Sequence, residues 1–439
     1  MGTNAAGTTV TAGATLRLTG VNYSTTEALS INGAGAGGAG GGALVSSGTS
    51  AFAGQITAAT DATINAGNGT LALSGGVVKD GTTLTFKGAG GTITISGTGI
   101  SGVSAFSDLV VDGTTVTENV ANTYNGPTTI TNGGTLNANT AGALPAGTRS
   151  AVSFTGSGAP TLSLGASQVA ASLSSSTTTP NAAVVTLGSN TLTVGAASGS
   201  TTFAGSIGGA GNLIKDDAST QVLSGSNGYT GTTTVSGGKL EVTGSLSGTT
   251  GVTVSNGGAL LLNNNANNII KTGATLTVNG STVQIGGGVA GKNQTFGSLT
   301  LSGNSTLDFG TAANGNALTF ASAGTFTGTL KVLNWTAGSY PAEGPDGGSI
   351  GDGRDRWLFN APSGYTPSQL ATIEFFSDDG GISLGSARQI SFGGTSYQIV
   401  PVPEPATTTL IGTIALCALF GYRDRRRFTG FGKRTAARR

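Results

Sequence analysis

Closely spaced aspartates are the residues of this chain that come nearest to a chemical site. Asp346, Asp352 and Asp355 lie within GPDGGSIGDGRDRW at 344–357, and carboxylate oxygens are the ligands that calcium prefers. Their spacing matches neither an EF-hand loop nor the nonapeptide repeat that binds calcium. We therefore expect a solvated loop here and no metal site.

Two pairs of adjacent acids, Asp216-Asp217 and Asp378-Asp379, offer the groups that polysaccharide hydrolases use. Neighbouring residues on a strand point to opposite faces, so such a pair would not converge on one bond. We predict surface charges beside turns. The glycine run GAGAGGAGGG at 33–42 is also predicted to be a flexible corner or loop, because no Lys-Ser/Thr and no βαβ unit accompany it.

Residue types that many active sites need are missing. The chain of 439 residues has no His, and its single cysteine is Cys417. An internal disulfide, a Cys/His metal site and His acid–base catalysis are therefore excluded. We expect no enzymatic activity, no cofactor and no bound metal.

The few basic residues gather at the C-terminal end. From Arg423 onward there are eight Lys/Arg and one Asp, whereas the preceding residues carry a net charge of −6. Charged residues make up 9% of the chain, against about 25% in typical domains. A sparse and mildly acidic body does not favour nucleic acid as a partner.

A short unit recurs along the chain and predicts strands separated by glycine corners. Thr–Val/Ile–Thr/Ser alternates with a period of two, which turns the aliphatic side chain inward and the hydroxyls outward. Glycine then allows a positive φ at the corner, and Leu begins the next strand on the inner side. Clear copies are TVTAGATL (9–16), TITNGGTL (129–136), TVSGGKL (234–240) and TVSNGGAL (253–260).

The even spacing of these units favours an all-β, right-handed parallel β-helix over residues 1–335. Strand plus corner takes roughly eight to twelve residues, and a sandwich or barrel would show longer strands with more bulky residues. In a solenoid each coil stacks on the next, so that like residues form ladders. NNNANN at 263–268 fits either an asparagine ladder at a corner or an ordinary polar loop.

Two longer copies resemble the autotransporter-associated β-strand repeat of large secreted bacterial proteins. They are NTYNGPTTITNGGTL from Asn122 and NGYTGTTTVSGGKL from Asn227, and GSIGGAGNLIKDDASTQVLSGS at 205–226 is similar to the same family. The resemblance implies an exported protein. Pro127 and one extra residue before Leu136 depart from the pattern, so we expect a weakly formed coil there.

Residues 336–400 are predicted to form a cap that shields the last coil. Aromatic residues and charges concentrate in this region. TPSQLATI at 366–373 predicts one helical turn with Thr366 as N-cap and Pro367 at the first helical position. The aromatic residues are Trp335, Tyr340, Trp357, Phe359, Tyr365, Phe375 and Phe376.

The uncharged stretch Ala406–Tyr422 predicts one transmembrane helix. It would span about 25 Å, near the lower limit for crossing a bilayer. Pro403 and Pro405 stop the helix from extending upstream. The arginines that follow would remain cytoplasmic by the positive-inside rule, together with the basic tail 428–439. The body would then lie outside the cytoplasm.

Residues 401–427 resemble the PEP-CTERM sorting signal of Gram-negative bacteria. The likeness rests on a Pro-Glu-Pro tripeptide, a short apolar span and an arginine cluster, in that order. It implies an exosortase-type membrane protease as partner, an inner-membrane intermediate and release to the outer surface or an exopolysaccharide matrix. The matching residues are Pro403, Glu404, Pro405, Arg423, Arg425, Arg426 and Arg427.

An exported protein also needs an N-terminal export signal. MGTNAAGTTV has no basic n-region and no apolar h-region. We therefore expect that the natural chain begins further upstream, with a signal peptide.

These observations together predict a non-enzymatic surface or extracellular-matrix protein with a structural and adhesive role. Its Thr/Ser/Asn-rich faces would offer many weak hydrogen bonds to exopolysaccharide, and multivalency would supply the avidity. Two alternatives stay open. One is a polysaccharide-degrading β-helix enzyme, and the other is an autotransporter-like passenger secreted by a separate barrel.

Overall fold

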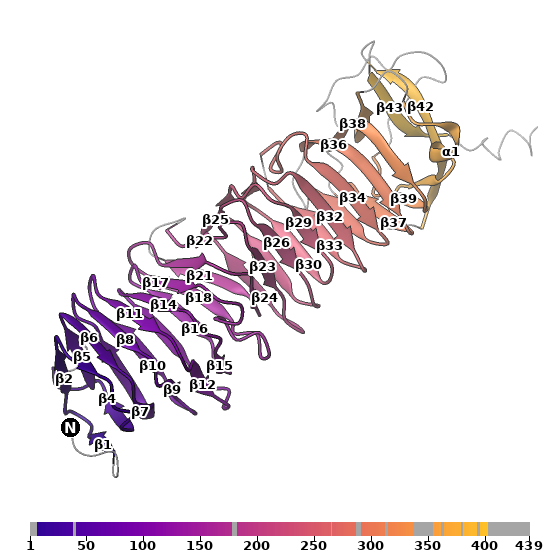
Figure 1. The fold of residues 1–439 in the computed structure, drawn as a ribbon. Helices are drawn as coiled ribbons and strands as arrows, with labels where there is room; N and C mark the ends of the chain where they lie inside the picture. Colours follow the sequence, from indigo (N-terminus) through magenta and orange to yellow (C-terminus); the bar gives the residue numbers. More distant parts are fainter. Residues whose placement is uncertain are drawn as a thin grey trace, which may run out of the picture.

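The body of the chain is an elongated rod of stacked coils (Figure 1). A computed structural model describes residues 7–37, 41–177, 182–264, 266–286, 291–311, 315–336, 354–360, 364–378, 381–392 and 396–402. Short strands pair in parallel from one coil to the next along the rod. The indigo end of the chain lies at one end of the rod, and the last strands lie at the other.

Most coils present three short strands, one on each of three faces. Face 1 comprises β2 (Leu16–Thr19), β5 (Leu44–Ser47), the second half of β7 (Ile56–Asn65), β10 (Leu84–Lys87), β13 (Leu109–Asp112), β16 (Thr128–Thr131), β18 (Val152–Gly156), β21 (Leu173–Thr177), β24 (Ser200–Phe203), β27 (Thr220–Leu223), β30 (Lys239–Val242), β33 (Ala259–Leu262), β35 (Thr282–Ile285), β37 (Ser305–Asp308), β39 (Leu330–Leu333) and β41 (Ile373–Phe376).

Face 2 follows face 1 along each coil, and face 3 completes the turn. Face 2 comprises β3 (Asn22–Tyr23), β6 (Thr49–Phe52), β8 (Thr70–Leu73), β11 (Thr92–Ile95), β14 (Thr115–Glu118), β17 (Thr135–Ala138), β19 (Thr161–Leu164), β22 (Val184–Thr186), β25 (Ser206–Gly208), β28 (Ser226–Asn227), β31 (Ser245–Leu246), the first halves of β36 (Asn293–Ser302) and β38 (Ala317–Phe326), and β40 (Arg356–Phe359).

The strands of face 3 run beside the start of β7 and the ends of β36 and β38. They are β1 (Thr8–Val10), β4 (Leu29–Gly33), β9 (Val77–Val78), β12 (Ile100–Gly102), β15 (Thr123–Tyr124), β20 (Gln168–Ala170), β23 (Thr191–Val194), β26 (Asn212–Lys215), β29 (Thr233–Val235), β32 (Gly251–Ser255) and β34 (Thr275–Asn279).

Alternation along each strand builds the core. In β11, Ile93 and Ile95 are fully buried, whereas Thr92 and Thr94 keep part of their surface in solvent. The register then stacks like on like, as where Ile93 pairs with Leu71 of the coil before it. The predicted inward aliphatic residues and outward hydroxyls are confirmed, because a strand with period-two side chains can bury only one face.

The corners need residues whose backbone adopts the left-handed conformation, with positive φ. In TITNGGTL, Asn132 and Gly133 have φ values of 51° and 74°, and glycine reaches this region without a Cβ clash. The predicted glycine corner is confirmed. The expectation of a weak coil at Pro127 is wrong: β16 pairs with both β13 and β18, because the extra residue is absorbed in this corner outside the paired strands.

Aromatic residues fill the interior near the C-terminal end of the rod. Trp335 packs edge-on between Phe309 and Phe375, with ring centroids 4.9 and 4.8 Å away. Trp357 packs edge-on against Tyr365 at 5.7 Å. Phe359 and Phe376 are also buried, and Tyr340 lies outside the described residues.

Parallel pairing continues through β40 and β41, and two antiparallel strands then close the end. β42 (Ser383–Phe392) pairs with β41 and with β43 (Ser396–Pro401), which also pairs with β40. Helix α1 (Pro367–Leu370) has Thr366 as its N-cap, in a capping box with Gln369. The predicted helical turn is confirmed, because Pro367 and the threonine hydroxyl favour a helix start.

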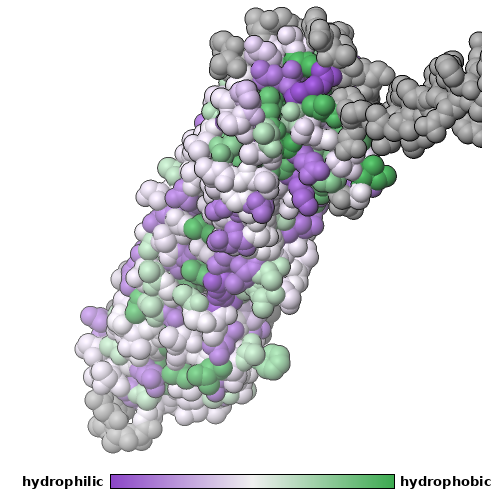
Figure 2. Space-filling model, turned by 90° about the vertical axis from the view of Figure 1, so that its right-hand side faces the viewer, coloured by the Kyte–Doolittle hydropathy of each residue, from purple (hydrophilic) through white to green (hydrophobic). Residues whose placement is uncertain are grey.

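The side of the rod that Figure 2 shows is mostly of intermediate hydropathy. Figure 2 shows hydrophilic and hydrophobic side chains scattered over a pale background on this side of the rod. Short hydroxyl-bearing and glycine residues produce that background, since they are neither strongly polar nor strongly apolar. The parallel solenoid is therefore confirmed as a coil with an aliphatic inside and a weakly polar outside.

Candidate functional site

Each of the two longer repeat copies forms a buried network of side-chain hydrogen bonds that joins neighbouring coils of the solenoid. We call this network a staple. In the first copy the buried Asn122 accepts a hydrogen bond from the Ile100 amide, 2.7 Å away, and donates to the Ala143 carbonyl, also at 2.7 Å. One side chain thus joins the coil before it to the coil after it. The Tyr124 hydroxyl, also buried, hydrogen-bonds with the Thr128 hydroxyl at 2.7 Å.

The staple continues into the following coil. Thr128 hydrogen-bonds with Ser150 at 2.9 Å, and Ser150 donates to the Gly126 carbonyl at 2.9 Å. Burial raises the pKa of Tyr124 well above its usual value, so its hydroxyl stays neutral and available to the network. A buried polar network of this kind fixes one arrangement of the coils, because every member has a partner.

The second copy repeats the staple with the same residue types. Asn227 accepts from the Ile207 amide at 3.1 Å and donates to the Ser245 carbonyl at 3.1 Å. Tyr229 hydrogen-bonds with Thr233 at 2.6 Å. Thr249 takes the place of the serine and donates to the Gly231 carbonyl at 3.0 Å, completing the chain of bonds.

The two staples occupy different faces. In the first copy the tyrosine lies on face 3 in β15 and the threonine begins β16 on face 1. In the second copy the tyrosine follows β28 of face 2 and the threonine begins β29 on face 3. The staple is therefore a local device that works at more than one corner of the coil.

The glycine of each staple is required by the close approach of the neighbouring coil. A Cβ on Gly126 would lie 2.3 Å from the Ser107 carbonyl oxygen, and a Cβ on Gly231 would lie 2.1 Å from that of Gly211. Neither distance is compatible with a side chain. The Asn-x-Tyr-x-Gly pattern thus combines a polar bridge with a position where two coils touch.

The adjacent acids Asp216 and Asp217 lie in the turn after β26, not on a strand. Arg149 holds Asp216 with two hydrogen bonds of 2.8 and 2.9 Å and reaches Asp217 at 2.6 Å. The predicted surface charges beside a turn are confirmed, but the expectation that the two carboxylates point apart is wrong, because Asp217 adopts φ 53° in the turn. The two carboxylates share the single positive charge of Arg149, which ties together parts of the chain 67 residues apart.

The other candidate acids divide between the interior, a turn and the part of the chain outside the described residues. Asp355 is fully buried, so the expectation of a solvated loop is wrong for this residue. It accepts hydrogen bonds from the Asn316 and Thr336 amides at 2.9 and 2.6 Å, and burial raises its pKa to about 6. Asp378 accepts from the Gly381 amide at 2.6 Å within a turn. Asp346, Asp352 and Asp379 lie outside the described residues.

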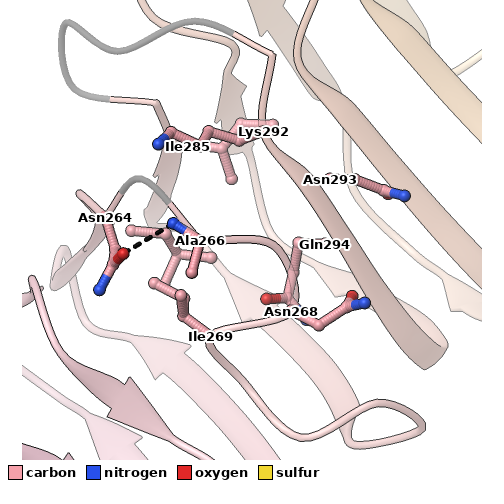
Figure 3. A pocket seen from close by; sticks show the side chains of 9 residues that line it. Asn264, Ala266, Asn268, Ile269, Ile285, Lys292, Asn293 and Gln294 are labelled. Carbon is pink, nitrogen blue, oxygen red and sulfur yellow. Dashed lines mark hydrogen bonds between the residues drawn. The ribbon is translucent and has the colours of Figure 1, made fainter. Parts of the chain in front are cut away.

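Asn264 and Asn268 line a small hollow beside β33 and β35 (Figure 3). Its volume of about 10 Å³ is close to the minimum that one water molecule requires. Asn264 donates to the Gly244 carbonyl at 2.9 Å and Asn268 accepts from the Thr295 amide at 2.8 Å. These two asparagines of the run thus bind the backbone of neighbouring coils and are not stacked on one another.

Sequence reasoning missed several charged residues inside the solenoid, among them Lys79 and Glu118. Both are fully buried. The alternation of inward and outward residues along the strands could have identified both residues. Glu118 ends the strand TVTE at an inward position, and Lys79 follows Val77 and Val78 at another inward position. Over the residues that the structure describes, no three His, Cys, Asp or Glu side chains gather closely enough to hold a metal ion.

The predicted sorting residues, Pro403 to Pro405 and the arginines from Arg423, lie outside the described residues, as does the predicted membrane helix. Within the described part of the chain, no helix is both long and apolar enough to cross a bilayer.

Fold and staples define the chain as a parallel β-solenoid protein held together by polar bridges between coils. Two of its segments, 112–138 and 213–242, match the family model of the Passenger-associated-transport-repeat. The chain thus carries passenger-associated transport repeats, which suggest an exported, surface-associated protein. The predicted resemblance at Asn122 and Asn227 is confirmed. No curated protein and no solved structure matches the chain.

Proposed function

We propose that this chain is an exported, non-enzymatic rod, coiled in the right-handed sense, that acts as a structural and adhesive component of a cell surface or matrix. A threonine ladder on the outside of face 2 is the observation that carries this proposal. The register pairs six threonines in consecutive coils: Thr49, Thr70, Thr92, Thr115, Thr135 and Thr161.

The ladder offers hydroxyl groups at a regular spacing. Rungs of a parallel sheet lie about 4.8 Å apart. Thr161 donates to the Ala159 carbonyl, and among the described residues no hydrogen bond is recorded for the other five hydroxyls. The neighbouring outward column is also free of charge, with Ala72, Thr94 and Thr117 among its members.

Such a surface suits a neutral or weakly charged polysaccharide. Each hydroxyl contributes a weak hydrogen bond, and binding strength grows when many bonds form to one long chain. A rod that repeats the same contact over many coils offers that multivalency without a deep pocket.

We further propose that the C-terminal segment delivers the rod. The Pro403-Glu404-Pro405 tripeptide, the helix 406–422 and the arginine cluster would hold the protein in the inner membrane, and an exosortase-type protease would then release it. A second route is supported by the family name of the matched repeats: the rod would be a passenger carried by a separate outer-membrane partner.

One experiment on the purified chain distinguishes polysaccharide binding from polysaccharide cleavage. Polysaccharides are offered in a pull-down assay while the release of reducing ends is followed. We expect binding without release, and replacement of Thr92, Thr115 and Thr135 by Val to weaken binding at least about fivefold. Lys87→Gln, on face 1, serves as the matched control. New reducing ends in the reaction would contradict the adhesive role and favour the polysaccharide-degrading alternative.

A further inference from the structure

Strand pairing is interrupted on every face in the middle of the rod. Pairing runs up to β15 on face 3, β21 on face 1 and β25 on face 2, and it starts again at β20, β24 and β28. Among the described residues, no strand on one side of these gaps pairs with a strand on the other side. Because the gaps fall in neighbouring coils, they form one spiral seam that divides the rod into two blocks.

The two blocks are out of phase by one face. Each block holds one of the matched repeats, 112–138 in the first and 213–242 in the second. The staple threonine of the first repeat, Thr128, begins β16 on face 1, whereas that of the second, Thr233, begins β29 on face 3. Equivalent strands therefore do not continue the same column, and the like-on-like register of the other coils is lost at the seam.

Buried glutamine side chains take the place of strand pairs at the seam on faces 3 and 1. Gln168 accepts a hydrogen bond from the Leu144 amide at 3.0 Å and donates to the Thr140 carbonyl at 2.6 Å. Gln221 accepts from the Leu173 amide and donates to the carbonyl of the same residue, both at 3.0 Å. A glutamine amide carries the same donor and acceptor groups as a peptide, so each side chain replaces one rung of the missing ladder.

Face 2 keeps backbone hydrogen bonds across the seam. The amides of Gly228 and Thr230 donate to the carbonyls of Ile207 and Gly209, both at 2.9 Å. The staple asparagine Asn227 adds its bond to the Ile207 amide. Face 2 is therefore the most firmly joined side, whereas faces 1 and 3 are joined mainly by side chains.

The ion pairs of Arg149 with Asp216 and Asp217, which we call the Arg149 clamp, cross the seam on the outside. Arg149 precedes β18 of the first block, and the two acids follow β26 of the second. The guanidinium also donates to the carbonyl of Gly195, between β23 and β24, at 3.2 Å. The clamp thus lies at the corner between faces 3 and 1, opposite the backbone bonds of face 2.

We propose that the rod bends at this seam, with face 2 as the hinge and the Arg149 clamp as the latch that keeps the rod straight. Opening separates the two blocks at the corner of faces 3 and 1 and leaves the bonds of Gly228 and Thr230 in place. The side chains of Arg149, Asp216 and Asp217 are 30%, 25% and 45% exposed. Salt screens partly exposed charges such as these, so the latch weakens as the ionic strength rises.

A further gap in face 2 shows why the seam is different. Gln294 replaces a strand pair there, with bonds of 3.1 Å to both the amide and the carbonyl of Ile270. The other two faces remain paired beside this gap, through β33–β35 and β34–β36. Two continuous ladders hold the coils parallel, so we expect no bending at Gln294.

Distances between spin labels on face 1 of the full chain test the hinge. Thr85→Cys and Thr282→Cys give a label pair across the seam, and Thr220→Cys and Lys331→Cys give a pair within the second block. All four positions lie on strands of face 1 and keep part of their surface in solvent. Cys417→Ser removes the natural thiol, and double electron–electron resonance measures the distances.

We expect Arg149→Gln to lengthen and widen the distances across the seam, because face 1 lies on the opening side. The distances within the second block should stay unchanged. Lys87→Gln, which removes the exposed ion pair with Asp112 inside the first block, is the matched control and should change neither pair. Unchanged distances across the seam in Arg149→Gln would overturn the latch. Equal widening of both label pairs would overturn the position of the hinge.

The glutamines provide a second test by hydrogen exchange. Gln221→Leu should speed exchange of the Leu173 amide at least about fivefold and should also widen the distances across the seam. Gln294→Leu makes the same change at the gap in face 2: it should speed exchange at Ile270 but leave the distances within the second block unchanged. Circular dichroism verifies that both variants fold. Widened distances within the second block of Gln294→Leu would overturn the special role of the seam.

Discussion

The staple tyrosines and threonines show how a single buried hydroxyl can order a solenoid. Each tyrosine hydroxyl is completely buried and has a partner four residues further on, at 2.7 Å in the first copy and 2.6 Å in the second. Loss of one partner leaves the other polar group buried and unsatisfied, which typically costs about 1–3 kcal/mol. The staple should therefore behave as a unit, not as a set of independent bonds.

Tyr229→Phe tests this unit. We expect the free energy of local opening to fall by about 1–2 kcal/mol, because the Thr233 hydroxyl loses one of its two buried partners and keeps only Thr249. Hydrogen exchange of the amides in β29 and β30 reports the change. The double variant Tyr229→Phe/Thr233→Val should cost less than the sum of the two single variants. Additive effects would show that the hydroxyls act independently.

Buried Glu118 gives the rod a dependence on pH. Its pKa is raised to about 8 by burial, so the folded chain retains a proton that the unfolded chain loses above about 4.3. Stability is therefore fully present in acid and falls as the pH rises toward 8. Comparison is best made in a Lys79→Met background, because the Lys79 amine otherwise acts on the pKa of Glu118.

We expect Lys79→Met to lose stability relative to Lys79→Met/Glu118→Gln between pH 5 and pH 8, by on the order of 3 kcal/mol. Denaturant unfolding followed by circular dichroism measures both chains. A difference that stays constant over this range would show that Glu118 is already ionised in the folded state.

At the scale of the strand and corner, packing between coils decides which glycines matter. Gly228 and Gly231 are three residues apart in the same repeat copy. A Cβ on Gly228 would meet no atom within 4 Å, whereas one on Gly231 would lie 2.1 Å from a backbone carbonyl of the neighbouring coil. Neither residue has a positive φ, so the two positions differ in space and not in backbone strain.

Gly231→Ala should therefore separate the coils locally, while Gly228→Ala should be nearly neutral. We expect a loss of at least about 2 kcal/mol for the first variant, because a rigid carbonyl must shift to admit the methyl group. Hydrogen exchange around β26 and β29 compares the two. Equal effects would argue against close stacking at this corner.

The sequence predicted the elements well where a simple period governed them. Alternation in strands such as TITI placed the core, and the Asn-Gly corner followed from backbone geometry. Prediction from the sequence failed for Asp216 and Asp217. Their carboxylates converge on Arg149, a residue 67 positions away in the chain. The staple partners Ser150 and Thr249 were missed for the same reason, since stacking and not local sequence brings them to the staple threonines Thr128 and Thr233.

The molecule as a whole is a rod in which most of the specific chemistry is directed inward. Staples, the Arg149 clamp and the aromatic packing near Trp335 all join one coil to another. The outside repeats small hydroxyl side chains on a sheet face, as in the face 2 ladder. Such an object suits adhesion or scaffolding, provided that it is delivered to the outside of the cell.

Delivery is the central claim, and intact mass spectrometry of the protein recovered from the producing cell tests it most directly. Surface and extracellular-matrix fractions are compared with the cytoplasm. The account predicts a mature chain in the outer fractions that ends near Pro403 and lacks the helix 406–422 and the basic tail. A cytoplasmic chain that retains Arg439 would contradict it.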